Sequence, residues 1–168
     1  MRLSGINILT SGLLLAGAAL LTGCNSECTE NKNALPRADF MGTLSPGEQL
    51  TLTGLQVEGV GAPGDSLLIE SSSTLSEFYI PFRIDTDRTV YRFTLEDRGL
   101  QSEVTFDYDR IPTFVSAECG VSYRYEIRDI VCSGTLIDSV TCPDGYIDNR
   151  AGVNLHIWLS PAAYELPL

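Results

Sequence analysis

The feature that most constrains the fold is an alternation of apolar and polar residues along much of the chain. Residues 91–95 read Tyr-Arg-Phe-Thr-Leu, and residues 104–108 read Val-Thr-Phe-Asp-Tyr. Successive side chains of a β-strand point to opposite faces, so this two-residue period is typical of strands that bury one face. Helical periodicity is nearly absent. The chain is therefore expected to bury its core between β-sheets.

The two runs predict a β-hairpin with one buried aromatic face. In this register Phe93 and Phe106 point inward, whereas Arg92 and Asp107 point to solvent. A slip of one residue would reverse all four side chains. The remaining aromatic residues of these runs, and of the run that starts at Val121, are interpreted as core residues and not as a ligand platform: Tyr91, Tyr108, Tyr123 and Tyr125.

Further short runs with strand character are separated by turn residues. They cover residues 50–54, 66–70, 78–84, 121–127, 135–141 and 155–159. Pro81 marks its run as an edge or bulged strand, because proline cannot donate to a ladder. Many short strands with regular turn signals predict an all-β fold, an immunoglobulin-like antiparallel β-sandwich of about eight or nine strands. A small barrel is the alternative.

The start of the chain has the pattern of an export signal. Arg2 precedes an apolar run over residues 6–21, which leads into Leu-Thr-Gly-Cys ending at Cys24. A basic start, an apolar core and small residues at the end are typical of a secretory signal peptide, and the run is short for a transmembrane helix. The ending also resembles the bacterial lipobox. That resemblance implies cleavage before Cys24, diacylglycerol on its thiol and an acyl chain such as palmitate on the new amine. Plain secretion or an uncleaved anchor is the alternative.

This interpretation divides the chain into three parts. Residues 1–23 are the signal peptide, residues 24–35 the lipidated N-terminus with a short linker, and residues 36–168 one β-sandwich domain. The expected location is the cell envelope, with the membrane as a partner through lipid on Cys24 and the outer membrane favoured. The net charge of −11 argues against nucleic acid as a partner, since phosphate binding needs clustered Lys and Arg.

Four cysteines remain in an exported chain once Cys24 carries lipid: Cys28, Cys119, Cys132 and Cys142. An even number suggests two disulfides, for which three connectivities exist. Cys132 and Cys142 are close in sequence and separated by a Ser-Gly turn signal, which favours a local pair and leaves Cys28–Cys119. Free buried thiols are the alternative.

Catalytic patterns are weak. Gly64-Asp65-Ser66-Leu67 resembles the nucleophile block of the GDSL-type esterases, but Val153 stands where that pattern needs an Asp three residues before His156. A hydroxyl nucleophile without a base is weak at neutral pH. Acidic residues cluster at residues 85–87, 107–109 and 144–148, and spacing along a sequence cannot place a pair of them at a glycosidic bond. We therefore expect no enzyme and no cofactor.

Two candidate binding sites stand out. Asp144, Asp148 and Asn149 lie in one Gly-containing loop and offer oxygen ligands for calcium, although the spacing is not that of an EF-hand. A solvated turn is the alternative, so no metal site is assigned. Trp158 and His156 alternate with Leu155 and Ile157, so the last run places them on the face opposite the core. An exposed Trp158 would suggest a carbohydrate or partner site.

The mature chain resembles a family of small Bacteroidetes lipoproteins of unknown function. The resemblance rests on the lipobox, on Cys28, on Phe114-x-Ser116-x-x-Cys119-Gly120 and on Ile137-Asp138-Ser139. It supports Cys28–Cys119 as a shared bridge and makes Cys132–Cys142 an extra one. It implies no activity. The expected function is that of an envelope-anchored lipoprotein that binds or scaffolds an envelope protein or glycan without catalysis. A glycan- or calcium-binding module of an uptake or adhesion assembly is the alternative.

Overall fold

The computed structural model describes residues 33–44, 47–61, 66–117, 119–150 and 152–165. They all belong to Asn31–Leu168, the second of the chain's two compact units. The predicted signal peptide, the lipid site at Cys24 and the cysteine at Cys28 lie outside these residues. No helix in the described part has the length and apolar character needed to cross a bilayer.

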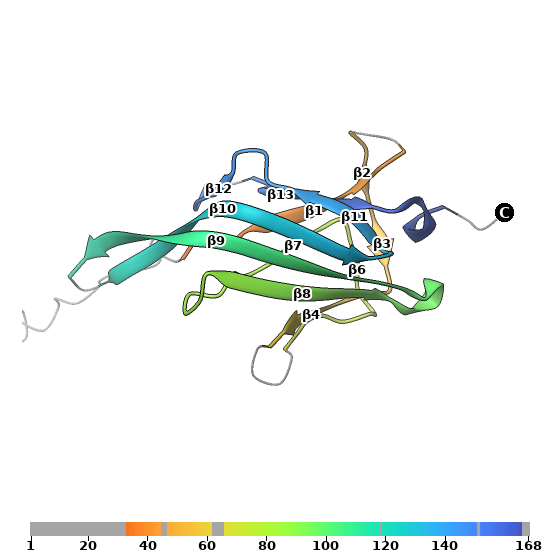
Figure 1. Cartoon of the computed structure of the whole chain (residues 1–168), viewed down its shortest axis with the longest axis horizontal. Coiled ribbons are helices and arrows are strands. Elements are labelled where there is room, and N and C mark those ends of the chain that lie inside the picture. The colour runs from red at the N-terminus through yellow and green to blue at the C-terminus, as the bar shows by residue number, and fades with distance from the viewer. Residues whose placement is uncertain (1–32, 45–46, 62–65, 118, 151, 166–168) are drawn as a thin grey trace, which may run out of the picture. The chain divides into compact units, whose positions relative to one another are not determined.

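In the larger of two main sheets, three consecutive strands, β8, β9 and β10, form an antiparallel meander, to which β4 and β5 are added at one edge and β12 at the other (Figure 1). Its order is β12–β10–β9–β8–β4–β5, and every neighbouring pair is antiparallel. The strands are β4 (Leu55–Val60), β5 (Leu67–Ile69), β8 (Arg88–Leu95), β9 (Leu100–Ser116), β10 (Gly120–Gly134) and β12 (Tyr146–Ile147).

The smaller sheet joins the beginning of the described chain to its end. Its order is β11–β13–β1–β2, and β7 also pairs with β1. Strands β1 and β13 are parallel, and the other pairs are antiparallel. The strands are β1 (Arg37–Gly42), β2 (Gln49–Leu50), β7 (Glu77–Tyr79), β11 (Ile137–Thr141) and β13 (Leu155–Leu159). Strands β3 (Leu52–Thr53) and β6 (Thr74–Leu75) form a separate pair, and the short 3₁₀ helices are η3 (Glu96–Arg98) and η4 (Pro161–Ala163).

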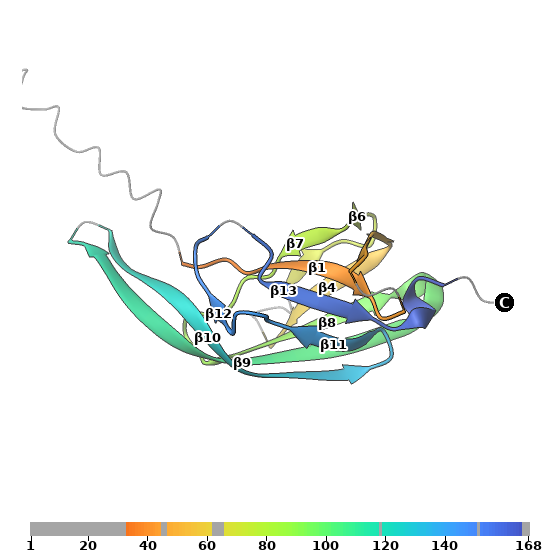
Figure 2. The same cartoon turned by 90° about the horizontal axis from the view of Figure 1, so that it is seen from above.

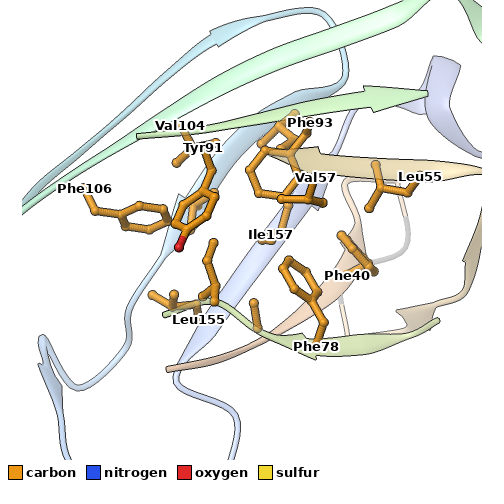
Figure 3. Close-up of a cluster of buried hydrophobic side chains, with 14 of the residues drawn as sticks. Phe40, Leu55, Val57, Phe78, Tyr91, Phe93, Val104, Phe106, Leu155 and Ile157 are labelled. Carbon is orange, nitrogen blue, oxygen red and sulfur yellow. The ribbon is translucent and has the colours of Figure 1, made fainter. Parts of the chain in front are cut away.

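The core lies where the inner faces of the two sheets meet (Figure 3). Phe40 of the smaller sheet stacks on Phe78 at 5.5 Å between ring centroids, and Phe78 meets the edge of Phe93 of the larger sheet at 6.3 Å. A second aromatic group surrounds Phe82, whose ring stacks on Tyr108 at 4.7 Å and meets Tyr125 edge-on at 5.3 Å. Alternating apolar residues from both sheets thus build one continuous core.

The all-β sandwich and the register of the hairpin are confirmed. Phe93 and Phe106 are fully buried, whereas Arg92 and Asp107 face outward and pair with charges on neighbouring strands. The described residues form thirteen strands and not eight or nine, because several strands contain only two or three residues. Strand β7 ends at Tyr79, just before Pro81, which agrees with the missing donor of proline.

The predicted Cys132–Cys142 disulfide is wrong for this structure, because both cysteines are free thiols. The Cys132 thiol contacts the backbone of Val140, and the Cys142 thiol contacts the backbone of Gly145. The Cys132 thiol thus lies beside Val140, which is about 7 Å from Cys142 along an extended chain. A Cys132–Cys142 disulfide would instead need the two Cβ atoms about 3.5–4.5 Å apart. Cys119 is disulfide-bonded, but Cys28 lies outside the described residues, so the Cys28–Cys119 pairing stays a prediction.

Candidate functional site

The candidate site is the solvent side of the smaller sheet, which we call the outer face. It is formed by Arg37, Glu77, Asp39, His156, Thr141, Met41, Trp158 and Ser139. Strand β13 has the burial pattern that its alternation predicts: Leu155, Ile157 and Leu159 are buried, and His156 and Trp158 point outward. The predicted position of Trp158 on the face opposite the core is therefore confirmed.

Strand pairing assembles the outer face into two rows. In the first row, Asp39 lies opposite Glu77 on one side and His156 on the other, and His156 lies opposite Thr141. In the second row, Met41 lies opposite Trp158, which in turn lies opposite Ser139. Two rows of side chains from four strands thus place polar and aromatic groups next to one another.

Asp39 and His156 form the central contact of the first row. The His156 Nδ1 atom lies 2.7 Å from the Asp39 Oδ1 atom. Asp39 is only 7% exposed although it points away from the core. A carboxylate only accepts hydrogen bonds, so Nδ1 carries the proton in this pair. In a neutral imidazole this tautomer leaves Nε2, at the other edge of the ring, as a hydrogen-bond acceptor.

Trp158 connects the two rows. Its Nε1–H donates a hydrogen bond to the Thr141 hydroxyl at 3.1 Å, while the indole stays partly exposed. At the other end of the face, Arg37 Nη1 lies 3.5 Å from Glu77 Oε1. The Arg37 Nε atom is buried and has no partner in the described structure. The outer face therefore combines an aromatic ring, a hydroxyl, a carboxylate–imidazole pair and a cation.

Asp39 and Glu77 were missed by the sequence analysis. Arg37-Ala38-Asp39-Phe40-Met41 alternates polar and apolar residues up to Phe40, which is the signal that could have placed Asp39 on an outward face. The run is short, and the partner of Asp39 is 117 residues away in sequence. No local pattern could have joined the two.

The esterase-like serine lies elsewhere. Ser66 precedes β5 and lines a cavity of about 240 Å³ at the β4–β5 edge of the larger sheet, together with Leu67, Arg83 and Tyr91. His156 belongs to the outer face of the other sheet. Among the described residues around this cavity there is no histidine, aspartate or glutamate. Nothing in the described structure gives Ser66 the base that a serine nucleophile requires.

The clustered acids of the larger sheet and of the loop before β8 form ion pairs with arginines. Asp85 accepts two hydrogen bonds from Arg83, and Asp107 accepts two from Arg88. These hydrogen bonds hold the pKa of each of the two carboxyls below its ordinary value. A general acid in glycoside hydrolysis needs a raised pKa, so this electrostatic setting is the opposite of the required one.

In the candidate calcium loop, the Asp148 carboxylate contacts Arg150. Asp148 Oδ1 accepts a hydrogen bond from the backbone N–H of Arg150 at 2.9 Å, and Asp148 Oδ2 lies 3.1 Å from Arg150 Nε. Both oxygens of this carboxylate are thus engaged within the chain. Across the described ranges, no three His, Cys, Asp or Glu side chains come together in a way that could hold a metal ion.

Comparison with known proteins identifies a family and no activity. A family model described as a family of unknown function (DUF6452) matches residues 50–159. No curated protein and no solved structure matches the chain. The matched segment includes β13 with His156 and Trp158, and β11 with Thr141, but begins after β1 with Asp39. The chain therefore belongs to this family of unknown function, DUF6452.

Proposed function

We propose that the protein is a lipid-anchored, non-enzymatic binding module of the cell envelope, and that its outer face docks another envelope component. The observation that carries the docking surface is the arrangement of the partly exposed Trp158 beside the Asp39–His156 pair on the outer face. Tryptophan is enriched at the centres of binding surfaces because its ring is large and its N–H remains polar.

A non-enzymatic role is supported by what surrounds the candidate groups. Within the described chain, His156 has no hydrogen bond to a serine, threonine or cysteine, so the Asp39–His156 pair has no nucleophile to activate. The carboxyls clustered on the larger sheet and in the loop before β8 form ion pairs with arginines. Paired charges of this kind stabilise an exposed sheet surface and do not create a reactive group.

The anchor is supported by the N-terminal sequence. The apolar run over residues 6–21 and the lipobox-like ending at Cys24 favour acylation, as does the resemblance to small Bacteroidetes lipoproteins. Three acyl chains on one cysteine would give stable attachment, since two lipid signals already suffice. The outer membrane is the membrane that we propose.

A glycan ligand is the second candidate for the outer face. Trp158 lies in register with Ser139 and hydrogen-bonds Thr141, so hydroxyl groups and a carboxylate–imidazole pair surround an aromatic ring. A sugar ring offers both an apolar face for stacking and hydroxyls for these polar groups. Trp158 is the only tryptophan, so its fluorescence reports directly on a ligand at this face.

Photo-crosslinking tests the docking surface. Benzoylphenylalanine replaces Met41 on the outer face, and in a matched control it replaces Thr94 on the solvent side of the larger sheet; both positions are partly exposed. We expect a discrete crosslinked product from position 41 in intact envelopes and none from position 94. Trp158→Ala should abolish the product without changing the circular dichroism spectrum. Equal products from both positions would refute the assignment.

Titration with envelope oligosaccharides separates the two candidates. A saturable change of Trp158 emission, with no crosslinked protein from position 41, would favour the glycan. A crosslinked protein with unchanged emission would favour protein docking. Hydrolysis of the oligosaccharide during the titration would overturn the non-enzymatic role.

Fractionation tests the anchor. We expect the wild-type chain to incorporate radiolabelled palmitate and to fractionate with outer membranes. Cys24→Ser should prevent labelling and leave the chain unprocessed or in the soluble fraction. A Cys24→Ser chain that is cleaved and membrane-bound like the wild type would refute lipidation at this residue.

A further inference from the structure

The β9–β10 hairpin extends beyond the rest of the sandwich. Strands β9 and β10 contain 17 and 15 residues, and their turn end runs past the ends of β1 and β13 (Figure 2). We call the part from Pro112 to Tyr123 the arm. An arm of paired strands that carries exposed apolar side chains beyond the sandwich needs a physical reason.

The arm continues the core-facing side of the sheet into solvent. Residues 104, 106 and 108 of β9 are buried, and residues 112 and 114 lie on the same face because β9 is regular from Val104 to Phe114, the extra residue next to the turn lying beyond Phe114. Phe114 is 70% exposed and lies directly opposite Val121, which is 49% exposed. The two side chains form an apolar cross-strand pair near the end of the arm.

The described chain starts against this same arm. The Asn33 side-chain oxygen accepts a hydrogen bond from the backbone N–H of Tyr123 at 2.9 Å, and the Ala34 N–H donates to the Tyr123 carbonyl at 2.7 Å. Cys119, one residue before β10, is disulfide-bonded. Asn33 is the ninth residue after Cys24, a reach of at most about 32 Å. The described chain, whose N-terminal side leads to the proposed anchor, therefore begins beside the arm.

From this geometry we infer that Phe114 and Val121 insert into the lipid bilayer that holds the anchor. The inference rests on the proposed lipidation of Cys24. Aromatic and aliphatic side chains gain free energy when they leave water for the interfacial region of a membrane. The rival occupant within the chain is residues 25–32, but these read Asn-Ser-Glu-Cys-Thr-Glu-Asn-Lys and offer almost no apolar surface. With a net charge of −11, the contact depends on apolar insertion and not on anionic lipid.

The arm thereby sets the orientation of the domain. A lipid anchor alone would let the domain rotate about a short linker. An anchor together with an inserted hairpin end contacts the bilayer at two points, which restricts that rotation. The sandwich then stands on the end of its longest hairpin, with η3 at the opposite end of β9 farthest from the bilayer. The outer face runs along the side of the domain, so a partner would approach it laterally.

Tryptophan fluorescence in vesicles tests the insertion. The acylated full-length chain carries Trp158→Phe, which removes the only native indole, together with Phe114→Trp. The matched control carries Trp158→Phe with Val131→Trp, since Val131 is an exposed apolar residue of β10 far from the arm end. Both chains are reconstituted into phosphatidylcholine vesicles with brominated acyl chains, and flotation measures how much chain is bound.

We expect the indole at position 114 to shift to the blue and to lose most of its emission to the brominated chains, while the indole at position 131 is unaffected. Equal results in vesicles with and without anionic lipid are expected. Chains that float with the vesicles but keep full emission at position 114 would overturn the insertion while leaving the anchor intact. Chains that do not float would overturn the anchor itself. A blue shift without bromolipid quenching, in a chain that sediments as a dimer, would assign the arm to a second copy and overturn the insertion.

Discussion

Two tyrosines lie in one aromatic cluster of the core. The same Tyr→Phe substitution is expected to lower the unfolding free energy at one of them and to raise it at the other. Tyr108 and Tyr125 are both fully buried, and their rings meet edge-on at 5.2 Å. Tyr→Phe at either position removes one hydroxyl and leaves the ring. The change in packing is therefore the same in both variants. The difference between their unfolding free energies reflects the different hydrogen bonding of the two hydroxyls.

The Tyr108 hydroxyl belongs to a closed ring of hydrogen bonds. It donates to the Arg83 carbonyl at 2.8 Å and lies 2.7 Å from the Thr89 hydroxyl, which in turn accepts from the Arg83 N–H at 3.1 Å. Since the phenol has only one proton, Thr89 must donate to Tyr108. Tyr108→Phe leaves the Thr89 hydroxyl and the Arg83 carbonyl without this partner, which costs about 1–3 kcal/mol of unfolding free energy.

The Tyr125 hydroxyl is buried and has no hydrogen-bond partner among the residues that the structure describes. Burying such a group costs about 1–3 kcal/mol, so Tyr125→Phe should raise the unfolding free energy by up to that amount. Equilibrium urea denaturation of both variants measures the difference: the midpoint should rise for Tyr125→Phe and fall for Tyr108→Phe, with unchanged slope. Similar destabilisation by both substitutions would refute the reasoning, since it would show that the Tyr125 hydroxyl is hydrogen-bonded in solution.

Three further substitutions or conditions test the fold. Gly134→Ala should destabilise by more than about 2 kcal/mol, because Gly134 has φ +109° and an added Cβ would lie 2.3 Å from the Gln101 carbonyl oxygen; a thermal melt within a degree of wild type would contradict this. Phe106→Ala should cost about 3–5 kcal/mol, whereas Asp107→Ala should cost about 0–1 kcal/mol because its ion pair with Arg88 is at the surface; equal denaturation midpoints would refute the register. Burial raises the pKa of Tyr125 to about 12. The folded state therefore favours the neutral phenol, and the contribution of this preference to the unfolding free energy is complete below pH 10 and is lost as the pH rises from about 10 to about 12. Urea midpoints should therefore drop more steeply above pH 10 in the wild type than in Tyr125→Phe, and parallel curves would contradict the pKa.

The burial side of most strands could be predicted from the sequence. The alternation in residues 91–95, 104–108 and 155–159 decides which side chains point inward, because the two-residue period of a strand depends only on local backbone geometry. The hairpin of β8 and β9 was predictable for the same reason, since its strands are neighbours in sequence. The outward placement of His156 and Trp158 followed directly from this period.

The partners of these residues were decided by the tertiary structure. His156 contacts Asp39 because β1 and β13 are parallel neighbours, although they lie at opposite ends of the described chain. Cys132 contacts the backbone of Val140 and not Cys142. Asp107 contacts Arg88 of the neighbouring strand, while Asp85 and Asp87, in the loop before β8, contact Arg83 and Arg110. The side that a strand buries is a local property of the sequence. The residue that lies opposite each side chain depends on which strands pair and in which register, and only packing of the whole sandwich selects among those pairings.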